Sequence, residues 1–140
     1  MVRYLADSSI WGWANSGRRP DIAEKLAERL ESDEVATTDP VVLESLHRAR
    51  NRTEYEHLYT SLFEPLQVVP LTADAARRAL GVQRELASGT HGNHLRPAID
   101  YLIAAAAELA SDVVLWFLDR DLGVICRHTS QPYEAERGKS

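Results

Sequence analysis

The sequence predicts an α/β protein, a three-layer α/β/α sandwich whose central parallel sheet has four or five strands. Short apolar segments alternate with segments of helical periodicity along the whole chain, and this alternation is typical of parallel sheets. The segment 113–118 consists of six consecutive apolar residues, as expected of a strand buried on both faces. The 140 residues suffice for one core, so we expect one domain over residues 1–140.

The first expected elements are a strand and an amphipathic helix. Residues 2–6 form an apolar run with a single interruption, which predicts the first strand. Pro20 suits the first turn of a helix, because its missing N–H is not needed there. Behind it Ile22, Leu26 and Leu30 recur every four residues, which places them on one face of that helix.

The middle of the chain predicts two more strands, at 35–38 and 66–71. Between them, Asp39 and Pro40 have the order of a helix N-cap followed by the first helical residue. Residues 53–62 predict a further helix.

The last part of the chain predicts three helices around the buried strand. Thr72 is a suitable N-cap for a long helix that Gly89 ends. Pro97 begins a nearly all-apolar helix that extends through Ala110. After the buried strand, a last helix begins at about Arg120.

The composition indicates a cytoplasmic protein with no membrane partner. Cys126 is the only cysteine, so no internal disulfide can form and a reducing compartment is expected. The first residues lack the pattern of a signal peptide, and no apolar stretch approaches the roughly 20 residues that cross a bilayer. The formal net charge is −5, yet most of the basic residues are arginines, which suit bidentate phosphate contacts.

Five acidic residues stand where this fold places ligands. Asp7 directly follows the first strand, and Asp119 and Asp121 follow the buried strand. Glu44 lies on a predicted helix, and Asp100 lies in the first turn of the most apolar helix. Because ligands bind beyond the carboxyl ends of parallel strands, we expect these side chains to converge at one edge of the sheet.

Each of these acids also has a purely structural interpretation. Asp7 can cap a helix, Glu44 can pair with Arg48 one turn on, and Asp100 can interact with the helix dipole. The two late aspartates can serve in turns or caps. Their joint placement favours chemistry instead, because ionised carboxylates gather only where a cation holds them. All-oxygen ligands indicate Mg²⁺ or Mn²⁺, which could polarise a phosphoryl oxygen and activate water for phosphodiester hydrolysis.

Four segments resemble the motifs of PIN-domain ribonucleases, in the family's order. Residues 4–9 are similar to the opening strand with its aspartate and two small hydroxyl residues. Residues 40–46 resemble the helix that carries the second acid. Residues 98–107 resemble the third and most specific motif, and residues 118–122 resemble the fourth. The resemblance covers nearly the whole chain and extends to the VapC toxins.

The resemblance implies a PIN-like sandwich that acts as the toxin of a type II toxin–antitoxin pair. It implies a Mg²⁺- or Mn²⁺-dependent endoribonuclease, with RNA as substrate, a VapB-like antitoxin as partner and a homodimer as assembly. The implied catalytic metal ligands, with Asp121 assisting them, are Asp7, Glu44, Asp100 and Asp119. Ser9 would support the site through hydrogen bonds.

RNA next to a carboxylate cluster requires cationic side chains beside it. Arg96 and Arg120 lie closest in sequence to predicted ligands, and Arg48 follows Glu44 by one helical turn. In the polar loop, His91, His94 and Arg96 stay open as alternatives for the RNA contact.

The same residues allow other interpretations. A phosphotransfer or receiver-like module would share the fold class, but it needs a lysine near the phosphoryl group. The only lysines, Lys25 and Lys139, lie on an amphipathic helix and in the tail.

The alternative function is a catalytically silent PIN-fold module that binds protein. The chain retains an acidic residue at every acidic position of the four motifs, and this disfavours a silent module. Three tryptophans could stack on bases or pack in the core: Trp11, Trp13 and Trp116.

Overall fold

A computed structural model describes residues 1–89, 92–118 and 120–138, and of Arg120 only the backbone. Five parallel strands form one sheet in the order β3-β2-β1-β4-β5. Their bounds are β1 Arg3–Ala6, β2 Val35–Thr37, β3 Gln67–Val68, β4 Val113–Phe117 and β5 Tyr133–Ala135. The central strand β1 pairs with β2 on one side and with β4 on the other, so the predicted parallel sheet is confirmed.

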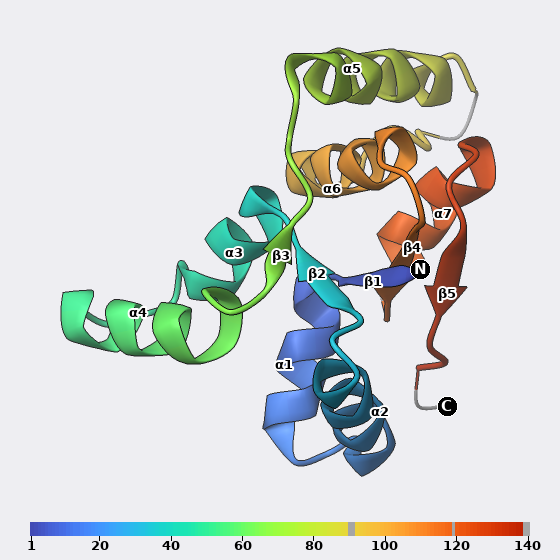
Figure 1. Ribbon diagram of the computed structural model, residues 1–140. Helices are drawn as coiled ribbons and strands as arrows, with labels where there is room; N and C mark the ends of the chain where they lie inside the picture. Colours follow the sequence, from blue (N-terminus) through green and yellow to red (C-terminus); the bar gives the residue numbers. More distant parts are fainter. Residues whose placement is uncertain (90–91, 119, 139–140) are drawn as a thin grey trace.

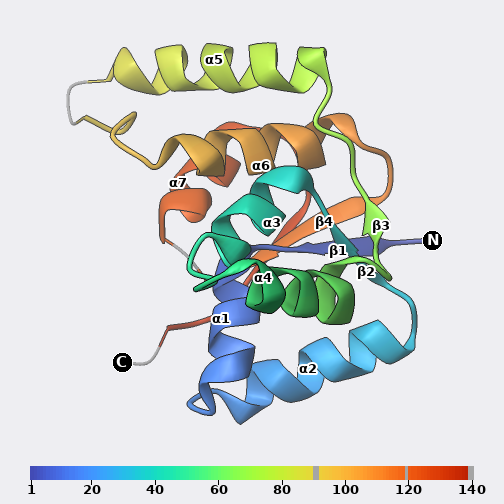
Figure 2. The same cartoon turned by 90° about the vertical axis from the view of Figure 1, so that its left-hand side faces the viewer.

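Helices cover both faces of the sheet, which confirms the predicted sandwich. Their bounds are α1 Ser8–Ser16, α2 Pro20–Glu31, α3 Asp39–Leu46, α4 Arg52–Leu58, α5 Ala73–Ala87, α6 Ala98–Leu109 and α7 Arg120–His128. Helices α1 and α2 lie on one side of the sheet, and α6 and α7 lie on the other (Figures 1 and 2). Helix α5 packs on the outside of α6, and α3 contacts both α1 and α6.

Three predicted boundaries in the middle of the chain are wrong. The strand predicted over residues 66–71 is only the two-residue β3, Gln67–Val68. Thr38, not Asp39, is the N-cap of α3, and Asp39 is already helical. The Thr38 hydroxyl donates to the carbonyl oxygen of Val69 at 2.7 Å, so it connects β2 to the segment after β3 instead of capping the helix. The predicted helix at 53–62 is an α-helix that ends at Leu58 and continues as one π-helical turn, Tyr59–Phe63.

The edge strand β5 has a polar sequence and depends on partners far away in the chain. Its residue Glu134 pairs with Arg29 of α2 at 2.9 Å, and Glu136, just beyond the strand, pairs with Lys25 at 2.6 Å. The Arg29 guanidinium also lies 4.4 Å from the ring centre of Trp116 on β4. Ion pairs from Arg29 and Lys25, with Arg29 itself held over Trp116 by a cation–π contact, therefore hold β5 in place. The sequence of β5 has no apolar periodicity that would predict a strand there.

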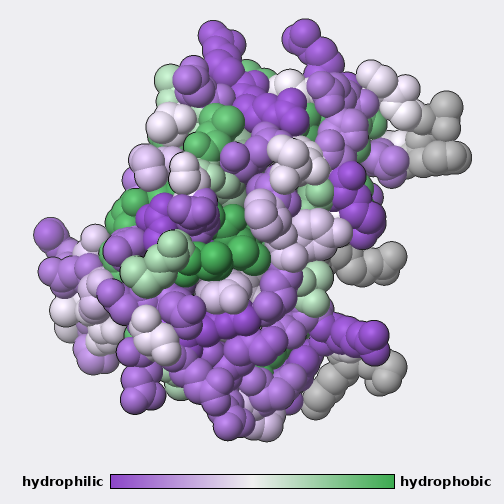
Figure 3. All heavy atoms as spheres, turned by 45° about the vertical axis from the view of Figure 1, so that its right-hand side comes forward, coloured by the Kyte–Doolittle hydropathy of each residue, from purple (hydrophilic) through white to green (hydrophobic). Residues whose placement is uncertain are grey.

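The core lies between the sheet and its helices. Trp116 is fully buried and Trp11 is 4% exposed, whereas Trp13 is only partly buried. On the face that Figure 3 presents, polar side chains cover most of the surface around one central apolar area. None of the described helices is long and apolar enough to span a bilayer.

The start of α5 gives a first test of the fold. The Thr72 hydroxyl accepts a hydrogen bond from the Ala75 N–H at 3.0 Å, as an N-cap does. Thr72→Ala should lower the free energy of unfolding by about 1 kcal/mol. Urea denaturation measures this change. Thr72→Ser retains the acceptor and should stay close to wild type; equal losses in both variants would show that the cap contributes nothing.

Candidate metal centre

Three acidic side chains converge beyond the carboxyl end of β1. Asp7 directly follows β1, Glu44 lies on α3, and Asp100 lies in the first turn of α6. One carboxylate oxygen from each lies within 4.8 Å of those of the other two. The parallel sheet thus brings together three of the five predicted acids from distant parts of the chain.

Asp7 connects the sheet to α1. Its backbone N–H donates to the carbonyl oxygen of Trp116 at 2.9 Å, next to the β1–β4 pairing. Its side chain caps α1 by accepting from the Ser9 N–H at 3.2 Å. The structural interpretation of Asp7 as a helix cap is therefore correct, and the same carboxylate also belongs to the acidic cluster.

Two serines of the first turn of α1 orient the carboxylates. The Ser9 hydroxyl donates to Oδ2 of Asp7 at 2.8 Å and accepts from the Leu118 N–H at 2.9 Å. The Ser8 hydroxyl donates to the carboxylate of Glu44. These bonds tie α1, α3 and the end of β4 into one rigid support for the acids.

The cluster lies in a poorly solvated environment. Asp7 is 1% exposed and Asp100 is 2% exposed, while Glu44 is partly buried. Burial raises the pKa of Asp7 to about 6; hydrogen bonds from Ser9 oppose the rise, and the negative charge of Glu44 adds to it. Among the residues that the structure describes, no arginine or lysine forms an ion pair with Asp7 or Glu44.

The donor atoms fit a small hard cation. All three groups are carboxylates, the ligands that Mg²⁺ and Mn²⁺ prefer over nitrogen or sulfur. Within the described part of the chain, the buried Oδ1 of Asp7 has no hydrogen-bond partner. A divalent cation would satisfy this oxygen and offset the repulsion among the three carboxylates.

The other predicted site residues lie near the cluster or outside the described part. Asp121, in the first turn of α7, accepts from the Arg96 guanidinium at 2.8 Å and is not one of the three clustered acids. The sequence did not predict this ion pair, because the two residues are 25 positions apart. Asp119, His91 and the side chain of Arg120 lie outside the described residues.

A groove of about 530 Å³ opens beside the cluster, between α1, α3 and the π-helical turn. Ser8, Ser9 and Glu44 line it next to the acids, and the exposed Arg48 lines it farther out. The predicted alternative of a Glu44–Arg48 ion pair is not formed. Arg48 therefore presents its charge to the groove, where an anionic ligand could contact it.

Ser9 offers a test of how the acids are oriented. Ser9→Ala removes the donor to Asp7 and leaves the partly buried Leu118 N–H without its acceptor. We expect the affinity for Mn²⁺, measured by calorimetry, to fall about tenfold, as for other groups that orient metal ligands. Ser16→Ala at the other end of α1 is the control, because within the described residues its hydroxyl forms hydrogen bonds only with the backbone of Trp13 and Arg18. An unchanged Mn²⁺ affinity in Ser9→Ala would contradict the orienting role.

Comparison with known proteins identifies relatives over almost the entire chain. The PIN domain family model matches residues 4–127. Ribonuclease VapC18 of Mycobacterium tuberculosis is 36% identical over 133 residues, covering 94% of this chain and 93% of that protein. Ribonuclease VapC51 of the same organism is 36% identical over 131 residues, covering 94% and 90%.

Two solved structures share the fold. One is a crystal structure of DNA-bound VapBC from Salmonella typhimurium, with a TM-score of 0.71 and 16% identity over 96% of this chain and 98% of that one. The other is VapBC2 from Rickettsia felis bound to a DNA fragment from its promoter, with a TM-score of 0.66 and 15% identity over 97% and 99%. At these identities the likeness concerns the fold.

Proposed function

Because this chain belongs to the PIN-domain family and to the VapC ribonucleases within it, we propose that it is an endoribonuclease toxin that hydrolyses RNA at the Asp7–Glu44–Asp100 cluster. The observation that carries the proposal is the convergence of these three carboxylates, two of them buried, with no described cationic side chain paired to Asp7 or Glu44. Such an arrangement is costly without a cation. A fold without catalytic activity would gain nothing from three carboxylates at one point.

Asp7, Glu44 and Asp100 would hold the cation, and Asp119 is proposed as a further ligand from its motif alone. Bound there, Mg²⁺ or Mn²⁺ would stabilise negative charge on the phosphoryl group and lower the pKa of the attacking water. Ser9 keeps Asp7 fixed, and Ser8 keeps Glu44 directed at the same point. Asp121 would assist from the edge of the site through its pair with Arg96.

RNA would reach the carboxylates through the groove that Ser8, Ser9 and Glu44 line. Phosphates approaching three acids are repelled unless cationic side chains accompany them. Arg48 is the best placed of the predicted arginines, because its charge is not paired within the described residues. Arg96 already forms an ion pair with Asp121. Arg120 is still proposed to contact RNA, on the basis of its place in the sequence alone.

We further propose the partners and setting that this family membership suggests. The two solved relatives are VapBC complexes, so a VapB-like antitoxin is the expected inhibitor. An arginine of the antitoxin could occupy the carboxylate cluster in place of the cation, because its fork bonds carboxylates well. The chain is proposed to form one PIN domain over residues 1–140, to assemble as a homodimer and to act in the cytoplasm.

Cleavage of total RNA by the purified protein tests the proposal. We expect defined cuts with Mn²⁺ or Mg²⁺ and none with EDTA. Asp100→Asn, purified in the same way, should be inactive. Growth should stop when the wild-type protein is expressed alone and resume when the antitoxin is co-expressed. If the wild-type protein binds antitoxin but leaves RNA intact with either metal, the silent protein-binding alternative is favoured.

A further inference from the structure

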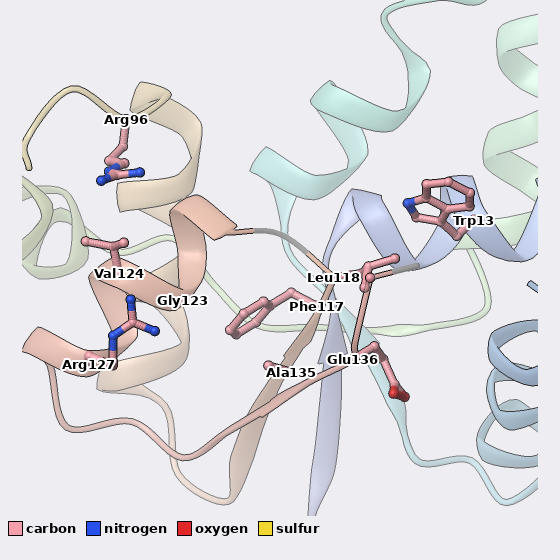
Figure 4. Close-up of a pocket in the computed structure, with 10 residues that line it drawn as sticks. Trp13, Arg96, Phe117, Leu118, Gly123, Val124, Arg127, Ala135 and Glu136 are labelled. Atoms are coloured by element: carbon pink, nitrogen blue, oxygen red, sulfur yellow. The ribbon is translucent and has the colours of Figure 1, made fainter. Parts of the chain in front are cut away.

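A second groove lies at the carboxyl ends of β4 and β5. It measures about 610 Å³ and is bounded by α1, the ends of β4 and β5, and α7 (Figure 4). This volume falls within the range of about 300–1,000 Å³ typical of sites for small ligands. The family motifs do not account for it, since of its lining residues only Leu118 lies in one of the four motif segments.

The groove offers a flat aromatic group and an apolar floor. Trp13, one turn after Ser9 on α1, lines one end and is the only one of the three tryptophans that is not buried. Leu118 and Val124, both partly exposed, supply the apolar surface between α1 and α7, and the buried Phe117 lies beneath them. Unstacked bases of single-stranded RNA bind to such surfaces, because every base has a π-face.

The opposite end of the groove carries positive charge. Figure 4 shows Arg96 and Arg127 at the α7 end and Trp13 at the α1 end. Arg127 is exposed and pairs with no carboxylate in the described part of the chain, whereas Arg96 is already paired with Asp121. Among the described residues that line the groove, Glu136 is the one carboxylate, and Lys25 balances it at 2.6 Å. Of the described cations in the groove, Arg127 is therefore the one available for an anionic ligand.

Two hydrogen bonds connect this groove to the metal centre. The Leu118 N–H donates to Ser9 Oγ at 2.9 Å, and Ser9 Oγ donates to Asp7 at 2.8 Å. Leu118 lines this groove, and Ser9 lines the groove that contains Glu44 and Arg48. The two grooves are thus linked through the Ser9 hydroxyl, which also bonds Asp7, so the second groove lies close to the carboxylates.

We propose that this second groove binds one nucleotide of the RNA strand, next to the phosphodiester at the carboxylate cluster. The base stacks on Trp13 and the apolar floor, and Arg127 contacts a flanking phosphate. The inference rests on the proposed ribonuclease function and adds a substrate site to it. A protein segment of the antitoxin could also enter an apolar groove, so the test includes that occupant.

Binding of RNA separates the two occupants. Each variant is combined with Asp100→Asn, which prevents cleavage, and the Kd for a fluorescein-labelled ten-nucleotide RNA is measured by anisotropy. We expect Arg127→Ala to raise the Kd about three- to tenfold and to flatten its salt dependence. Trp13→Leu should raise the Kd about tenfold, and Trp13→Phe should recover most of the affinity because it retains an aromatic face. Arg3→Ala, at the opposite end of β1, is the matched charge control.

The active single variants give a second measurement. On total RNA, Trp13→Leu and Arg127→Ala should cut more slowly than the wild type but at the same sites, because stacking and a phosphate contact tolerate every base. If Arg127→Ala and Trp13→Leu bind RNA as Arg3→Ala does, the nucleotide site is refuted. It is also refuted if they lose antitoxin while binding RNA normally. Wild-type protein that binds RNA through this groove without cutting it would overturn the ribonuclease proposal alone.

Discussion

Asp7→Asn should abolish RNA cleavage while the protein stays folded. Asp7 supplies one of the three clustered carboxylates, and the substitution removes its negative charge while preserving its size. Loss of one anionic ligand weakens cation binding and with it several kcal/mol of transition-state stabilisation. The cleavage rate under Mn²⁺ should fall about a thousandfold or more.

The same variant should be at least as stable as the wild type when no metal is present. The asparagine oxygen can still accept from Ser9, as Oδ2 of Asp7 does now. The substitution also removes one of three negative charges that lie within 4.8 Å of one another, which relieves their repulsion. Circular dichroism and thermal unfolding check that the fold survives.

Asp112→Asn is the matched control for this experiment. Asp112 is exposed and precedes β4, at the end of the sheet opposite the cluster. Its φ of 57° is one that asparagine tolerates well, so the substitution changes the same charge without strain. We expect wild-type cleavage from this control. Near-wild-type turnover in Asp7→Asn with either metal would rule out the proposed centre.

The predicted fold depended on features that the sequence displays locally. The strand at 113–118 and the helix that begins after Pro97 are both buried, and apolar residues fill them almost without interruption. Strand β5 is different, because its position depends on ion pairs with Lys25 and Arg29, more than a hundred residues away. No local pattern carries such information, so only the possibility of a fifth strand could be predicted.

The sequence also predicted which acidic residues form the candidate site, but it did not predict the contacts between side chains around them. The rule that ligands bind beyond parallel strands indicated Asp7, Asp119 and Asp121. Glu44 and Asp100 were added because of their positions on predicted helices, and the structure brings these two acids and Asp7 within 4.8 Å. The pairing of Arg96 with Asp121 was not predicted, since it depends on how the loop before α6 folds back onto α7. The second groove was also missed, because its walls come from segments that share no motif.

The pH dependence of stability gives the second large effect. The pKa of Asp7 is about 6 in the folded protein against 3.8 for the ordinary side chain, so the metal-free folded state holds this proton more tightly than the unfolded chain. Ionised Asp7 thus costs the metal-free protein on the order of 3 kcal/mol at pH 7. This cost should disappear as the pH falls from about 6 to about 4.

Comparison with Asp7→Asn separates the carboxylate cluster from the acids elsewhere in the protein. Groups such as Glu108 have a lowered pKa through their partner Arg78 and lose stabilisation as the pH falls, but they titrate equally in both proteins. In EDTA, the variant should therefore exceed the wild type in free energy of unfolding at pH 7, and the difference should vanish near pH 4. Urea denaturation at a series of pH values measures it.

Bound Mn²⁺ should make the wild type more stable than Asp7→Asn, the reverse of their order in EDTA. Mn²⁺ at a hundredfold excess over its Kd stabilises the folded state by about 2.7 kcal/mol, which corresponds to a rise in Tm of about 8 °C for a domain of this size. Protons and metal compete for Asp7, so the rise should shrink as the pH falls below about 6. Asp7→Asn should show little of it at any pH. Two results would show that the Asp7 carboxylate binds no cation. One is a wild-type Tm that does not change with Mn²⁺ at pH 7.5, and the other is an equal rise in Tm in both proteins.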